Sequence, residues 1–67
     1  MKHTVTVWRK PYEITVYQKS KSVWEAVGIY TDIQGVPGIT SEEIRITGRS
    51  EPDACRRWIR AAEYRGN

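Results

Sequence analysis

The stretch GRSEPDACRRWIRAAEYRGN, residues 48–67, decides the fold, because it has the features of one amphipathic helix. Ser50 can accept a hydrogen bond from a first-turn amide, and Asp53, three residues later, can complete a capping box. The apolar residues recur at helical spacing and form one stripe, namely Ala54, Cys55, Trp58, Ile59 and Ala62. The basic residues on the opposite side are Arg56, Arg57 and Arg60. With Gly66 as a stop signal, the chain is predicted to end in a helix that packs through its apolar stripe.

Upstream of this helix, alternating apolar and polar residues predict strands. The main strand candidates are residues 12–18, 23–31 and 43–47. A shorter alternating segment, Thr4 to Trp8, precedes Pro11, which interrupts the pattern. Strands joined by short turns favour an antiparallel sheet. We therefore expect one α+β domain over residues 1–67, with β-β-β-α order. Its three-stranded antiparallel sheet, with a possible extra N-terminal strand, carries the C-terminal helix on one face.

The longest strand candidate, Val23 to Thr31, is apolar on both of its faces. Ala26 and Gly28 are small enough to let a helix bearing Trp58 approach closely, so the helix is assigned to their face. The other face is left with Val23, Val27 and Ile29. An uncovered apolar face indicates an interface with another protein. Loop 32–41 folding back over this face is the alternative, and both remain open.

The bulk composition limits the classes of function. One cysteine among 67 residues excludes an internal disulfide framework and a multi-cysteine zinc site, and Cys55 is expected to be a small buried apolar residue. No apolar run approaches the length of a membrane helix, so a cytoplasmic protein is expected. The single histidine, His3, stands beside a terminus, and Glu42 and Glu43 are neighbours that point to opposite faces of a strand. We expect no catalysis, no metal and no cofactor.

Charge is unevenly distributed along the chain, although the net charge is only +3. Residues 1–21, 22–44 and 45–67 sum to +4, −4 and +3. The basic positions that could contact phosphates of a nucleic acid are Lys10, Lys19, Lys21, Arg56, Arg57 and Arg60. The same arginines could simply form a solvated helix face, and the segregated charges could be satisfied within the fold or across a dimer. Nucleic-acid binding is the first functional expectation, and a protein-interaction module or homodimer is the alternative.

Two families share local patterns with this chain. Tyr12 to Tyr64, with a Gly-x-Ser before an Ala-containing helix, resembles the sheet and final helix of a double-stranded-RNA-binding domain. That family has an additional N-terminal helix and a lysine-rich helix start, whereas Glu51 and Asp53 here would repel phosphate, so RNA binding does not transfer. Trp24-Glu25-Ala26 followed by Gly48 to Ala54 resembles the N-terminal domain of HicB-type antitoxins, which implies pairing with a toxin or with itself.

Overall fold

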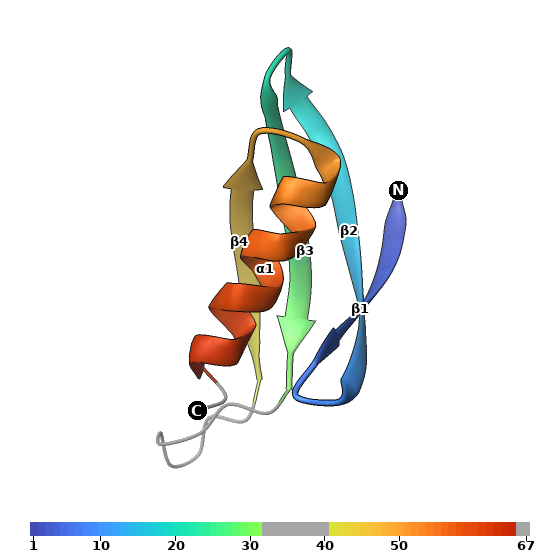
Figure 1. Cartoon of the computed structure of the whole chain (residues 1–67), viewed down its shortest axis with the longest axis vertical. Coiled ribbons are helices and arrows are strands. Elements are labelled where there is room, and N and C mark those ends of the chain that lie inside the picture. The colour runs from blue at the N-terminus through green and yellow to red at the C-terminus, as the bar shows by residue number, and fades with distance from the viewer. Residues whose placement is uncertain (32–40, 66–67) are drawn as a thin grey trace.

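The computed structural model describes residues 1–31 and 41–65. Its elements are β1 (Lys2–Val7), β2 (Lys10–Ser20), β3 (Val23–Tyr30), β4 (Glu42–Gly48) and α1 (Glu51–Arg65). The strands form one antiparallel sheet in the order β1-β2-β3-β4, and α1 packs on one face of it (Figure 1). The expected α+β class with a C-terminal helix is confirmed. The three-stranded sheet is wrong by one strand, because the optional N-terminal segment is a full member of the sheet.

The β1–β2 hairpin extends further than the sequence predicted. Its turn consists of residues that do not usually mark a hairpin turn, so the sequence pattern did not show where the turn lies. Trp8 and Arg9 form the two-residue turn with positive φ angles of 50° and 68°, a conformation that favours Asn and Gly. The Trp8 indole N–H donates to the Glu63 carbonyl, 3.3 Å away, and ties this turn to the end of α1. Pro11 lies one position beyond the turn-closing pair, at a non-hydrogen-bonded site, and β3 joins β2 only from Thr15. The missing proline N–H therefore costs no ladder bond.

The start of α1 is capped as the sequence predicts, with one shift. The Asp53 amide donates to the Ser50 hydroxyl at 3.2 Å, and the Ala54 amide donates to the Ser50 carbonyl at 2.9 Å. The Asp53 carboxylate accepts from the backbone N–H of Arg49, at 2.9 Å, rather than from Ser50 itself. Gly66, the predicted stop, lies outside the described residues. Within the described chain, α1 has 15 residues and many charges, and no helix is long and apolar enough to cross a membrane.

The core lies between α1 and the sheet face that the sequence assigned to the helix. Trp58 is fully buried, and its indole N–H donates to the Ile44 carbonyl at 3.1 Å. Its ring lies over Gly28, and the Tyr12 ring centroid is 6.1 Å from that of Trp58. The predicted apolar stripe is confirmed, with Ala54, Trp58 and Ala62 buried and Cys55 and Ile59 half-buried.

Replacing Gly28 with alanine tests how closely α1 approaches the sheet. An added Cβ would lie 2.5 Å from Ile14 Cγ2 and 3.0 Å from a ring carbon of Trp58. We expect Gly28→Ala to lower the free energy of unfolding by about 1–3 kcal/mol, the usual cost of overpacking a core. Urea denaturation of the variant and of the wild type measures this. A Gly28→Ala protein as stable as the wild type would contradict the packing.

Two substitutions at Trp58 distinguish the contribution of its burial to stability from that of its hydrogen bond. We expect Trp58→Ala to lower the free energy of unfolding by about 3–5 kcal/mol, because it empties the centre of the core. Trp58→Phe keeps part of the ring volume but loses the bond to the Ile44 carbonyl, and its cost should be smaller. Thermal unfolding followed by circular dichroism gives both values. A cooperative, near-wild-type Trp58→Ala transition would show that α1 is anchored elsewhere.

Candidate interaction surfaces

The sheet face turned away from α1, here called the open face, carries the aliphatic residues that the sequence left without cover. Ile29 is 58% exposed, Val23 is also exposed, and Val27 is half-buried. Tyr17 of β2 adds an exposed aromatic ring to the same face. The proposed cover, loop 32–41, lies almost entirely outside the described residues. The described part of the chain thus leaves these side chains accessible to another molecule.

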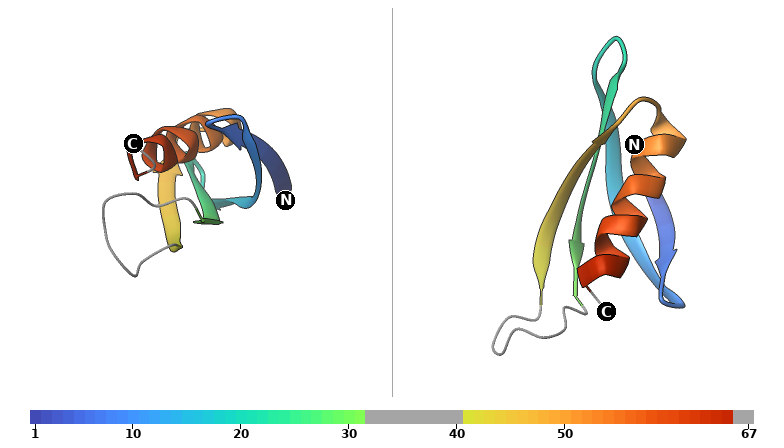
Figure 2. Two further views of the ribbon diagram at one scale, coloured as in Figure 1. Left: turned by 90° about the horizontal axis from the view of Figure 1, so that it is seen from below. Right: turned by 60° about the vertical axis from the view of Figure 1, so that its left-hand side comes forward.

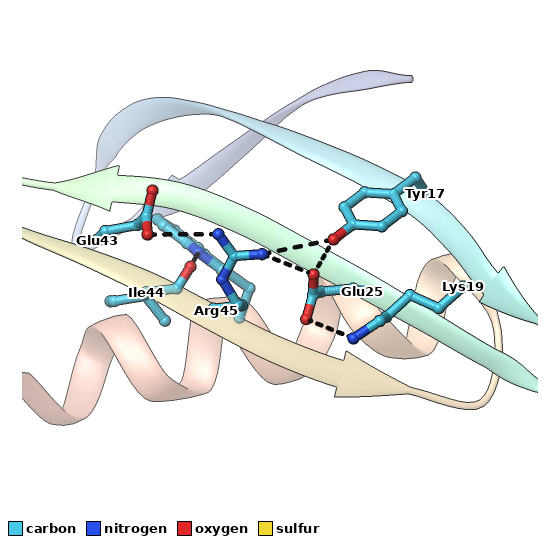
Figure 3. A network of polar contacts seen from close by, with 7 residues as sticks. Tyr17, Lys19, Glu25, Glu43, Ile44 and Arg45 are labelled. Atoms are coloured by element: carbon cyan, nitrogen blue, oxygen red, sulfur yellow. Dashed lines mark hydrogen bonds and ion pairs between the residues drawn. The ribbon is translucent and has the colours of Figure 1, made fainter.

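A charged network stands in the middle of the open face (Figure 3). Glu25 is only 3% exposed, although it lies on the side of β3 away from α1. Tyr17 donates its hydroxyl hydrogen to Glu25 Oε1, and Arg45 Nη1 lies 2.9 Å from the same oxygen. Lys19 Nζ approaches Glu25 Oε2 to 3.6 Å. Three partners from β2 and β4 therefore satisfy a carboxylate that their own side chains shield from water.

The charges of the open face cancel. Arg45 also pairs with Glu43 at 3.5 Å, and Lys2 pairs with Glu13 at 3.5 Å. By strand alternation, the charged residues of this face are Lys2, Glu13, Lys19, Glu25, Glu43 and Arg45. Three bases and three acids give a net charge of zero on a face that also carries exposed aliphatic groups. The chain's excess positive charge must therefore lie elsewhere.

The glutamates of the acidic middle segment find their partners within the described part of the same chain. Glu25 is neutralised by Lys19 of the N-terminal segment and Arg45 of the C-terminal segment. Glu42, at the start of β4, binds Arg65 of α1 at 2.7 Å. Of the two outcomes that the charge pattern allowed, satisfaction within the fold accounts for these glutamates, and a dimer is not needed to pair them.

The network perturbs the titration of its members. The Tyr17 hydroxyl, followed by Arg45 and Lys19, holds the pKa of Glu25 below its ordinary value against the opposing effect of desolvation. The same hydrogen bond raises the pKa of Tyr17, because ionised tyrosine would face the Glu25 carboxylate. Glu25 also raises the pKa of Arg45. The network therefore favours a carboxylate at Glu25 and a neutral phenol at Tyr17.

The six residues predicted to contact nucleic acid do not share one surface. Lys10 and Lys19 lie near opposite ends of β2, about 30 Å apart at the usual rise of a strand. Lys19 is paired with Glu25 on the open face, and Lys21 lies in the β2–β3 turn. The helix members form the part of the set that the fold brings together: Arg56, Arg57 and Arg60, all exposed on α1. Nucleic-acid binding by the full set stays a prediction.

A surface hollow of about 530 Å³ lies beside the helix arginines, and we call it the β4–α1 groove. It is lined by Ile46 of β4 and by one side of α1, comprising Asp53, Arg56, Arg57, Arg60, Ala61 and Tyr64. A neighbouring hollow at the end of β4 is lined by Arg49 and again by Arg57. The sequence pattern missed Arg49, because it precedes the helix and only the β4–α1 connection brings it to Arg57.

His3 has a neighbour that the sequence did not predict. Its Nε2 lies 3.4 Å from the Glu51 carboxylate, and Cys55 lines the same hollow between β1 and α1. Burial, with Glu51 nearby, raises the pKa of the Cys55 thiol, so that thiolate chemistry is disfavoured there. The trio therefore provides packing and a polar contact rather than an activated nucleophile.

Acid titration tests the network on the open face. Because the folded pKa of Glu25 is below its unfolded value of about 4.5, its stabilising effect is present above pH 4.5 and is lost as the pH falls through the folded pKa. Glu25→Gln should therefore be less stable than wild type at neutral pH, with the difference shrinking in acid. Unfolding midpoints between about pH 3 and pH 7 measure this. Tyr17→Phe removes the hydroxyl that lowers the pKa of Glu25, so this variant should lose stability at a higher pH than wild type. Parallel pH profiles for wild type and Glu25→Gln would contradict the network.

The surfaces offer contact chemistry, with apolar groups and paired charges on the open face and arginines beside α1. Among the described residues, no group of three or more His, Cys, Asp or Glu side chains is placed to hold a metal ion. Comparison of the chain with protein-family models, with curated proteins and with solved structures finds no match.

Proposed function

We propose that this chain is a non-enzymatic protein-interaction module that associates with a second copy of itself through the open face. The single observation that supports the proposal is an electrically balanced sheet face with exposed aliphatic groups, above all Ile29 at 58% exposure. Apolar surface that remains accessible in a small protein favours contact with another protein. A two-fold axis through this face would bring the aliphatic groups of two copies together.

The charge distribution supports self-association on this face in particular. Two copies with the same net charge repel one another, and the whole chain carries +3. The open face has no net charge, because each of its bases has an acidic partner within 4 Å. Two such faces can therefore come together without electrostatic repulsion from excess charge at the contact. The α1 side, with its clustered arginines, lacks this property.

The size of the open face predicts a weak dimer. Four strands of about eight residues cover roughly 500 Å² in projection, from the usual strand spacing and rise. Stable interfaces bury about 600–1,000 Å² on each partner, so this contact lies slightly below the usual lower limit. Nucleic-acid binding has less support than self-association, because Lys10 and Lys19 lie near opposite ends of β2 and Lys19 is already paired with Glu25 on the open face.

Solution mass at several concentrations tests the proposal. Sedimentation or light scattering should show a monomer–dimer equilibrium that shifts to monomer in Ile29→Lys. The fold should survive this change, because Ile29 is exposed and its neighbour on β4 is Glu43. The matched control is Tyr64→Lys, which adds the same charge at a site on α1 that is 85% exposed and should leave the dimer intact. A wild-type monomer up to about 1 mM would overturn the proposal.

A further inference from the structure

The β4–α1 groove is lined by one side of α1 from Asp53 to Tyr64 and by Ile46 of β4. After the two elements connect, α1 runs back toward the start of β4 (Figure 2). The connection at Gly48 closes one end, and the ion pair between Arg65 and Glu42, 2.7 Å long, joins the other. Between these points the floor is apolar, formed by Ile46 and Ala61. The exposed ring of Tyr64 stands on the rim. The groove thus has the shape and floor to hold an extended chain.

The strand beside this groove is an edge of the sheet. In the order β1-β2-β3-β4, β3 is the neighbour of β4 on one side, and no described strand lies on the other. Alternate residues of an edge strand direct N–H and C=O groups outward, which is a template for another strand. The Ile44 carbonyl already accepts a hydrogen bond from Trp58. The stretch from Arg45 to Gly48, which contains Ile46 of the groove lining, is the part of the edge beside the arginines.

The groove is positively charged. Its lining holds three arginines and one acid, Asp53, for a net charge of +2. Asp53 is already shared between Arg56 and Arg57, and Arg57 also faces the neighbouring hollow that contains Arg49. Arg60 forms no ion pair with any described residue. An anionic occupant would therefore meet arginines along the whole groove.

A second copy of the chain does not fit this charge. Pairing two β4 edges about a two-fold axis would place both α1 helices on the same side of a continuous sheet. Arg57 and Arg60 of one copy would then face the same arginines of the other, and like charges at an interface disfavour the contact. The occupant must instead bring negative charge, and a nucleic acid would bring it without backbone groups that continue the β4 ladder.

We propose that the β4–α1 groove binds an extended acidic segment of a partner protein, which adds to β4 as a fifth strand. Residues at alternate positions of that segment point toward α1. One aliphatic side chain lies on Ile46 and Ala61, and carboxylates on either side reach Arg57 and Arg60. Backbone hydrogen bonds to β4 supply affinity, and the arginines select for acidic sequence. This site is separate from the open face, so it goes beyond self-association.

Fluorescence anisotropy tests the site with a labelled peptide of about ten residues. The alternate positions of the peptide that would face α1 carry Glu, Val and Glu in turn, and the intervening positions carry Thr. Saturable binding should weaken about three- to tenfold in the double variant Arg57→Gln, Arg60→Gln, which removes two exposed ion pairs. The matched control, Lys2→Gln with Arg9→Gln, removes the same charge elsewhere and should bind like wild type. Equal weakening in both double variants would show a non-specific charge effect and overturn the site. Ile29→Lys should bind the peptide normally, which keeps this result independent of dimerisation.

Methylated peptides test strand addition itself. N-methylation of alternate amides along one edge of the peptide should abolish binding, whereas methylation along the other edge should preserve it. Equal binding of both methylated forms would exclude a fifth strand. A single-stranded oligonucleotide of similar length should compete poorly with the acidic peptide. Tighter binding by the oligonucleotide, lost in the Arg57→Gln, Arg60→Gln variant, would assign the groove to phosphates and overturn the proposal.

Discussion

The contact between Trp58 and Gly28 is the constraint on which the rest of the structure depends. A full indole ring fits between α1 and the sheet only because β3 has no side chain at position 28, where a Cβ would meet Ile14 and the ring. The indole N–H then finds the Ile44 carbonyl, so the large aromatic group is buried with its polar atom satisfied. Because this contact holds α1 against the middle of β3 and β4, it also decides which surfaces remain free.

The surfaces that remain free differ in net charge. On the open face, Glu25 and its partners on β2 and β4 cancel one another, and the aliphatic residues between them carry no electrostatic penalty for contact. On the α1 side, the arginines outnumber the acids near them. The excess positive charge behind the net charge of +3 therefore lies off the open face. A neutral face suits a like partner, and a basic groove suits an acidic one.

Two local conflicts mark where the fold overrides sequence preference. Trp8 and Arg9 occupy a turn with positive φ angles, and the hydrogen bond from Trp8 to the Glu63 carbonyl offsets part of that cost by joining the hairpin to α1. Glu25 is a buried acid in an apolar strand, and Tyr17, Lys19 and Arg45 supply the partners that make its burial tolerable. Both compensations join residues distant in sequence.

The sequence by itself determined the helix, its cap, its apolar stripe and the face of β3 that it covers, because these depend on local spacing and on the small size of Ala26 and Gly28. It also predicted the α+β class and the exposed aliphatic residues Val23 and Ile29. Only the tertiary structure showed that the N-terminal segment is a full fourth strand, because the Trp8-Arg9 turn contains no Gly or Asn that would mark a hairpin in the sequence. Strand register likewise decided the pairing of Glu25, and the β4–α1 connection placed Arg49 and Arg57 at the same hollow. Such long-range contacts follow from packing of the whole chain, and no local pattern encodes them.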